Sequence, residues 1–109
     1  MKNMSDAMVS TLVERFRALA DPTRIRVINQ LMGQGACTVG QLAADLAVGQ
    51  ASVSKHLDRL RAAGLVAYHQ QGNQRWYRII DPSLQQLCEL VCGAVQRQAE
   101  AAHNALCNP

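Results

Sequence analysis

Two cysteines four residues apart, Cys88 and Cys92, are the side chains of this sequence best suited to chemistry. They fall in a segment predicted to form a long helix, residues 82–106, and residues spaced by four lie on one face of a helix. Glu89 is adjacent in sequence but about a quarter-turn away, so it is not an obvious ligand. The pair predicts a two-point thiolate site for a soft metal ion or for trivalent arsenic or antimony, because these prefer sulfur ligands.

A third ligand must come from elsewhere, and Cys107 is the candidate. In an unbroken helix it lies about 22 Å beyond Cys92, at roughly 1.5 Å per residue. One chain closes that gap only if its tail folds back, whereas two antiparallel copies of the helix close it if they cross near Gln98. If the copies cross nearer Leu90, Cys88 and Cys92 instead meet their symmetry mates. The sequence leaves these alternatives open.

A second group of polar and basic side chains lies on a predicted helix over residues 50–63. Helical spacing places Val53, Leu57 and Leu60 on its core face. Recognition helices contact base edges near their first turn, where glutamine suits adenine, serine suits bases or phosphates, and alanine permits approach to a thymine methyl. The predicted DNA contacts on this helix are Gln50, Ala51, Ser52, Ser54 and Lys55. Arg75, at the end of a polar loop farther along, predicts a phosphate or minor-groove contact.

The elements that must position these side chains follow from apolar periodicity and from residues typical of helix ends. Asp21 and Thr38 are expected to cap helices, with Pro22 in a first turn. Gly33 and Gly35 are expected to end one helix and Gly64 another. The predicted helices cover residues 5–19, 22–32, 39–46, 50–63 and 82–106, and the predicted strands cover residues 65–69 and 75–80, joined by a loop over 70–74.

This order, four helices, a hairpin and a last helix, indicates a mainly α fold with a small β-hairpin. Two helices of about eight and fourteen residues around a three-residue turn are typical of a helix-turn-helix, here over residues 39–63. The hairpin over 65–80, in which Trp76 and Tyr77 are expected to pack, makes it a winged helix-turn-helix. We expect residues 1–109 to form one domain that dimerises through the terminal helices, since the last one carries a broad apolar stripe: Leu84, Leu87, Leu90, Val91, Ala94 and Val95.

Composition agrees with a small DNA-binding protein. The 109 residues are 49% hydrophobic and only 4% aromatic, so the core must be aliphatic, and a net charge of +3 suits a polyanionic partner. No apolar run has the length of a membrane span, and the first residues lack the apolar stretch of a signal peptide. We therefore expect a cytoplasmic protein with no membrane partner, whose four cysteines are thiols.

Three segments resemble the ArsR/SmtB family of metal- and metalloid-sensing repressors: ALADPTRIRVINQL, TVGQLAADLAVGQASVSKHLDRLRAAGLV and GNQRWYRI. The similarity covers about residues 12 to 95, and its most diagnostic part is the run from Gln50 to Leu60 followed by AGLV. The resemblance implies a homodimeric winged-helix protein that represses an operator on double-stranded DNA until an inducer binds. Carried over by position, the family's DNA contacts fall on Gln50, Ala51, Ser54 and Lys55, with Ser52 beside them. Relatives usually have serine as the helix cap where this chain has Gly49, which is nearly as acceptable there.

Other sensor sites of the family are incomplete in this chain. Cys37-Thr38-Val39-Gly40 stands where some members have Cys-x-Val-Cys, and Cys37 is expected to pack in the interior. Members that bind zinc at the last helix use paired aspartate and histidine, whereas Asp81 and His103 lack that spacing. His56 and His69 are interpreted as residues of the DNA face and the hairpin.

The leading hypothesis is a repressor that needs no cofactor for DNA binding and releases its operator when As(III), Sb(III) or a soft divalent ion binds Cys88, Cys92 and Cys107. An alternative with the same fold is a redox or sulfide sensor whose thiols become bridged. A third possibility is a dimeric interaction module that binds no DNA. An enzyme is least favoured, because the sequence has no glycine-rich phosphate loop and no obvious base for its cysteines.

Overall fold

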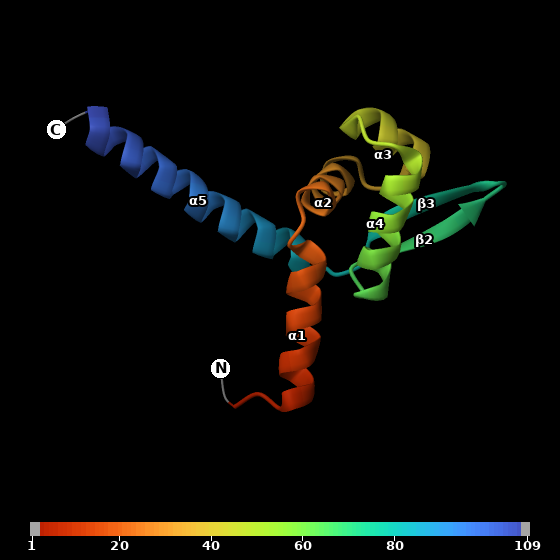
Figure 1. Cartoon of the computed structure of the whole chain (residues 1–109), viewed down its shortest axis with the longest axis horizontal. Helices are drawn as coiled ribbons and strands as arrows, with labels where there is room; N and C mark the ends of the chain where they lie inside the picture. Colours follow the sequence, from red (N-terminus) through yellow and green to blue (C-terminus); the bar gives the residue numbers. More distant parts are fainter. Residues whose placement is uncertain (1–2, 108–109) are drawn as a thin grey trace.

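The computed structural model describes the backbone of residues 3–107 and the side chains of residues 3–105. Within this range the helices are α1 (Asp6–Leu19), α2 (Pro22–Gln34), α3 (Val39–Leu46), α4 (Gln50–Ala62) and α5 (Ser83–Cys107), and the strands are β1 (Cys37–Thr38), β2 (Val66–Gln71) and β3 (Gln74–Ile79). The molecule is elongated, 59 × 40 × 20 Å, with the β2–β3 hairpin and the end of α5 at opposite ends of its long axis (Figure 1).

Polar side chains cap the first three helices, two of them at the predicted residues Asp21 and Thr38. The hydroxyl of Ser5 accepts a hydrogen bond from the backbone of Met8, and the carboxylate of Asp21 accepts one from Arg24. Thr38 and Gln41 form a reciprocal capping box at the start of α3. One prediction at a helix end is wrong. Gly33 lies inside α2, which continues to Gln34 and ends at Gly35 with a φ of +88°.

The three strands form one antiparallel sheet in the order β1-β3-β2. The ladder between β2 and β3 runs from Val66 opposite Ile79 to Gln71 opposite Gln74. Only Gly72 and Asn73 remain as the tip, and Gly72 has a φ of +61° that glycine adopts without strain. The predicted five-residue loop over 70–74 is therefore wrong, because its polar residues continue the ladder.

The winged helix-turn-helix fold is confirmed, with one strand more than the sequence indicates. This strand is β1, whose two residues pair with Trp76 and Tyr77 of β3. The core is mostly aliphatic and lies between α2, α3, α4 and the base of the hairpin. Its residues are Ala18, Val27, Ile28, Leu31, Cys37, Leu42, Ala43, Val53, Leu57, Leu60, Leu65, Val66, Tyr77 and Leu84. The predicted core face of α4 and the packing of Tyr77 are thus confirmed.

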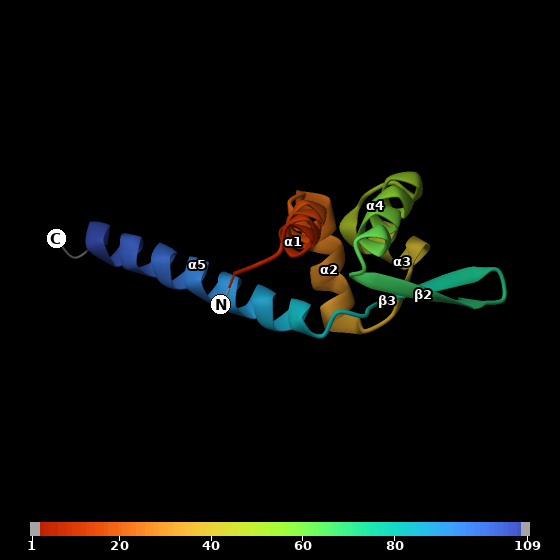
Figure 2. The ribbon, with the colours of Figure 1, turned by 90° about the horizontal axis from the view of Figure 1, so that it is seen from below.

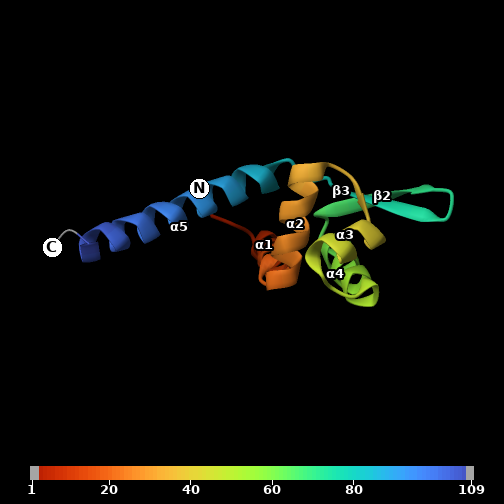
Figure 3. The same ribbon diagram turned by 90° about the horizontal axis from the view of Figure 1, so that it is seen from above.

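The terminal helices differ from this body. Figures 2 and 3 show α5 leaving it as a single rod, with α1 beside the body at the root of that rod. Leu84 is buried at the start of α5, but one turn and a half later Leu90 is 71% exposed. The large apolar side chains that these two helices leave exposed are Met8, Val9, Val13, Phe16, Leu90, Val91 and Val95. No helix in the described range is long and apolar enough to span a bilayer.

Candidate functional site

The start of α4 and the hairpin enclose an open groove of about 460 Å³. Its lining comes from three places in the sequence that the fold brings together: the start of α3, the first turns of α4 and the outer half of the hairpin. The residues are Thr38, Val39, Gly40, Gln50, Ser54, Gln70, Asn73, Gln74, Arg75 and Tyr77. The groove therefore unites three of the predicted DNA contacts, Gln50, Ser54 and Arg75.

The local backbone structure explains why Gln50 and the residues beside it lie at the groove. Ala47 adopts a left-handed conformation with a φ of 54°, and the turn leads to Gly49, which precedes α4 without a side-chain cap. A Cβ atom at Gly40 would lie 3.9 Å from the amide nitrogen of Gln50, so Gln50 rests close to the start of α3. The first turn of α4 consequently faces the groove with its backbone N–H groups free of any side-chain acceptor from Gly49.

The other predicted contacts on α4 lie on its outer faces. Ala51 and Lys55 are exposed, and Ser52 is partly exposed. The opposite face of the same helix is fully buried, so the helix cannot turn these side chains inward without exposing its core residues. These positions agree with the predicted DNA face.

Arg75 lies at a different place from the one that the sequence suggests. It stands opposite Gln70 within the ladder rather than at the tip of the hairpin. Its guanidinium carbon is 4.3 Å from the centre of the Tyr68 ring. A hydrogen bond with the side chain of Tyr77 raises the pKa of Arg75 above its ordinary value, and the nearby charge of Asp58 acts in the same direction. Arg75 is thus a fixed part of the groove wall.

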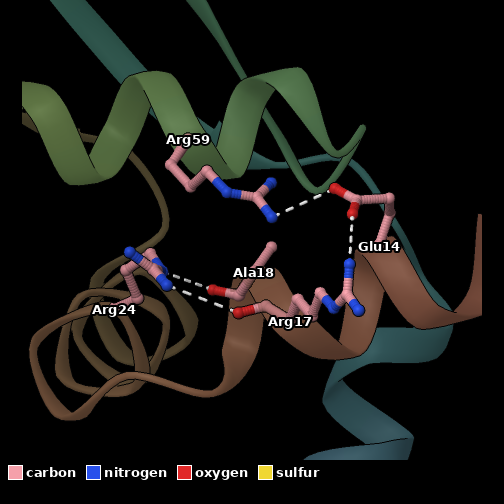
Figure 4. A network of polar contacts seen from close by, with 5 residues as sticks. All are labelled: Glu14, Arg17, Ala18, Arg24 and Arg59. Atoms are coloured by element: carbon pink, nitrogen blue, oxygen red, sulfur yellow. Dashed lines mark hydrogen bonds and ion pairs between the residues drawn. The ribbon is translucent and has the colours of Figure 1, made fainter.

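Other arginines hold the terminal helix α1 against the body (Figure 4). Arg59 of α4 forms an ion pair with Glu14 at 3.1 Å, and Glu14 also contacts Arg17 at 3.4 Å. Arg24 donates to the backbone oxygen of Ala18 at 2.6 Å, which would otherwise lack a partner because Pro22 has no N–H. It also donates to the backbone oxygen of Arg17 at 3.3 Å, which the N–H of Ala20 contacts as well. Although Arg59 belongs to α4, the helix with most of the predicted DNA contacts, its charge is directed toward α1.

His56 lies in the same junction and not on the DNA face that the sequence suggests for it. Its Nδ1 atom is 3.2 Å from a guanidinium nitrogen of Arg24 and 3.8 Å from the carboxylate of Asp21. The backbone N–H of Arg24, followed by the charges of His56 and Arg24, lowers the pKa of Asp21. In the same half of α1, Arg15 pairs with Asp81, just before α5, at 3.0 Å. Hydrogen bonds from Ser83 are the main reason why the pKa of Asp81 is also low.

The cysteines occupy three different environments. Cys37 is fully buried and donates to the side-chain oxygen of Gln34 at 3.2 Å. Burial, and then the charge of Asp45, raises the pKa of its thiol, as expected for an interior cysteine. Cys88 is half-buried against the core, and its pKa is raised by burial and then by Cys92, which is exposed.

Cys88 and Cys92 therefore stand together on α5, as predicted, with one thiol facing the body and the other solvent. The side chain of Cys107 lies outside the described residues. Within the described range no group of three or more His, Cys, Asp or Glu side chains is placed to hold a metal ion. One protomer offers the two thiols of α5 and no further ligand from these residues. A complete thiolate site needs the end of the chain or a second copy.

Residues 21–68 match the family model for bacterial regulatory proteins of the arsR family. Over 75 residues the chain is 46% identical to the HTH-type transcriptional regulator CmtR of Mycobacterium tuberculosis. This match covers 69% of this chain but only 63% of the length of CmtR. It is 36% identical over 93 residues to the transcriptional repressor SmtB homolog of Synechocystis, covering 85% of this chain and 70% of the relative. These relatives are transcriptional regulators and not enzymes, in agreement with the sequence analysis.

Two solved structures share the fold over nearly the whole chain. The AntR antimony-specific transcriptional repressor has a TM-score of 0.80 and 28% sequence identity, covering 92% of this chain and 90% of that one. A fragment of Mb0332 from Mycobacterium bovis, described as a homodimeric winged helix-turn-helix DNA-binding domain, has a TM-score of 0.80 and 26% identity, covering 93% and 95%. Together with the match to the family model, these similarities show that the chain belongs to the arsR family of bacterial transcriptional regulators.

Proposed function

We propose that this protein is a repressor that binds double-stranded operator DNA through the first turns of α4 and the groove beside the hairpin. The observation that carries the proposal is the meeting of Gln50, Ser54 and Arg75 in one groove. Glutamine and serine suit base edges, and arginine suits phosphate. The exposed side chains of Ala51 and Lys55 extend the same surface along α4.

The binding unit is a homodimer formed through α1 and α5. Exposed apolar side chains are gathered on these two helices, and burying one large aliphatic side chain contributes about 1.5–3 kcal/mol. A two-fold dimer places two recognition helices at half-sites about one DNA turn apart. The homodimeric state of the Mb0332 fragment supports this arrangement.

The inducer is Sb(III), As(III) or a soft divalent metal ion bound by Cys88 and Cys92, with Cys107 as the third candidate ligand. The donor set fits, because thiolates are the ligands that these centres prefer. The description of AntR as antimony-specific supports Sb(III) as the first ion to test. Because Leu90, Val91 and Val95 are the large apolar side chains exposed along α5, the helices of two copies are expected to cross near them. This crossing brings the thiols of both copies close together.

Ligation would fix the relative position of the two α5 helices. The recognition helices would then no longer match successive half-sites. To change the DNA-binding state from dominant to rare, the ligand must favour the released state by about 5.5 kcal/mol.

Selection of bound duplexes from a random-sequence library by the reduced protein tests DNA binding. We expect an enriched inverted repeat, whose affinity falls as salt rises because phosphate neutralisation releases counterions. Gln50→Ala should cost roughly 1–3 kcal/mol at particular base pairs only. No enrichment, or a salt-independent affinity, would leave the interaction-module hypothesis in its place.

Titration of the selected complex with antimonite under strict reduction tests the sensor. Cys88→Ser and Cys92→Ser should repress normally and fail to respond, and Cys37→Ser should leave the response unchanged. Cys107→Ser should weaken the response if Cys107 supplies the third ligand. Since burial holds the pKa of Cys88 high and a soft divalent ion displaces the thiol protons, the affinity for such an ion should rise with pH until the thiol is ionised. Antimonite, Sb(OH)3, instead releases one water for each thiol that it binds, so its affinity should change little with pH in that range. Release by oxidant or polysulfide but not by antimonite would favour the redox hypothesis.

A further inference from the structure

The ring of Tyr68 is the meeting point of two arginines from different elements. The guanidinium carbon of Arg75, on β3, is 4.3 Å from the centre of the ring. That of Arg61, in the last turn of α4, is 5.1 Å from the same centre. Tyr68 also contacts Tyr77, its partner across the ladder, with ring centres 5.3 Å apart. The ring thus joins the end of the recognition helix to the hairpin.

The stack leaves Arg75 charged and directed into the groove. Arg75 lines the groove together with Gln50 and Ser54, whereas Tyr68 and Arg61 do not. No carboxylate in the described part of the chain forms an ion pair with Arg75, in contrast to Arg59, which Glu14 neutralises. An aromatic face holds a guanidinium without neutralising it or occupying all of its N–H donors.

We propose that Tyr68 is a positioning residue that holds the guanidinium of Arg75 ready for a DNA backbone phosphate in the groove between α4 and the hairpin. The inference rests on the proposed DNA-binding function and adds to it a residue that carries no charge and makes no base contact. Arg61 fixes the ring to α4, so the phosphate site keeps its place relative to the base-contacting residues Gln50 and Ser54.

The physical gain is preorganisation. A free arginine side chain has many rotamers and loses them when it binds a phosphate, at a cost equivalent to about two- to tenfold in affinity. An arginine already stacked on a ring has lost that freedom on folding. Removing the ring should therefore weaken DNA binding through Arg75 and not through any contact of its own.

A double-mutant cycle on DNA affinity tests this inference. The probe is a fluorescein-labelled mixed-sequence duplex of about 30 base pairs, because phosphate contacts do not depend on sequence. Tyr68→Leu should raise Kd about two- to tenfold when Arg75 is present and leave it unchanged in an Arg75→Gln background. Tyr68→Phe keeps the ring and should keep the affinity. A merely structural role would give the same loss in both backgrounds and would overturn the proposal.

Salt titrations identify the group that touches phosphate. Arg75→Gln should reduce the slope of log K against log salt by about 0.9 per hairpin, and Tyr68→Leu should change it much less. Arg78→Gln is the matched control, since it removes the same charge from an exposed neighbour in β3 that does not line the groove. Fluorescence of Trp76, the one tryptophan of the chain, checks that the hairpin remains folded in each variant.

These experiments test the proposed function and the positioning role of Tyr68 separately. Failure of the unsubstituted protein to bind any duplex overturns the proposed function and this inference with it. The positioning role alone is overturned if the unsubstituted protein binds normally and Arg75→Gln leaves the salt slope unchanged. It is also overturned if Arg75→Gln and Arg78→Gln reduce the salt slope by the same amount.

Discussion

The body of the molecule and its terminal helices satisfy their side chains in different ways. In the body, α4 buries one face completely and β3 is paired on both sides. On α1 and α5, large apolar side chains such as those of Met8, Phe16 and Leu90 remain exposed to solvent. One copy of the chain therefore completes the proposed DNA-binding surface, whereas the apolar faces of α1 and α5 require a second copy to cover them.

The largest effect is expected where the body is complete. Leu57→Ala removes a fully buried side chain at the centre of α4 and should lower the free energy of unfolding by about 2–5 kcal/mol. Urea denaturation measures the loss. Leu57→Met conserves volume and should cost less than about 1.5 kcal/mol. If both variants lost the same free energy of unfolding, the Leu57 side chain would not be tightly packed in the core.

A charge on the open face of α5 should break the dimer and leave the body folded. Leu90→Asp desolvates a carboxylate at the expected crossing point, and losing the leucine alone costs about 1.5–3 kcal/mol of association per buried side chain. Sedimentation velocity at several concentrations measures the shift to monomer. Gln98→Asp adds the same charge two turns farther along, and we expect it to leave the dimer intact. The reverse result would move the crossing point to Gln98 and make Cys107 of the second copy the neighbour of Cys92.

The helices of the body could be predicted because their limits depend on nearby residues. Asp21, Pro22 and Thr38 act on backbone groups within one turn, so their roles are visible in the sequence. The two-residue strand β1 could not be predicted, since it exists only through pairing with Trp76 and Tyr77, far along the chain.

The contacts made by the long arginine side chains were the least predictable feature of the candidate site. Arg59 lies on the recognition-unit helix but pairs with Glu14 of α1, and Arg75, a predicted DNA contact, stacks on Tyr68. Tyr68 attracts no attention in the sequence because its role depends on two partners from different elements. The one local signal that could have indicated this role is register: Tyr68 lies two residues from Gln70, the cross-strand partner of Arg75, within reach of a long side chain.

Loss of a cap within the body should have a moderate effect. Thr38→Ala removes the side-chain oxygen that accepts from Gln41, and it should lower the free energy of unfolding by about 1 kcal/mol. Thr38→Ser keeps that oxygen and should retain most of the stability. Denaturation of both variants at one protein concentration gives the comparison. A loss as large in the serine variant would assign the effect to the packing of the threonine methyl group in place of the cap.

The smallest effect is expected at the contact that joins the two regions. The pair between Glu14 of α1 and Arg59 of α4 has side chains that are 54% and 34% exposed, so its coupling free energy should lie between about 0 and 1 kcal/mol. A double-mutant cycle with Glu14→Gln and Arg59→Gln measures that coupling by denaturation. Arg17→Gln is the control, since Arg17 contacts the same carboxylate without leaving α1.

Salt then separates an electrostatic contact from a packing one. At about 1 M salt, charges on an exposed pair are screened within roughly 3 Å, and the coupling should nearly vanish. A weak, salt-sensitive contact would mean that α1 is held to the body mainly by Arg24 at its last carbonyl oxygens and by apolar packing, so that a second copy can shift α1 at little cost to the body. A coupling well above 1 kcal/mol that survives salt would instead join α1 rigidly to the recognition helix, and movements of the dimer interface would then reach the DNA face directly.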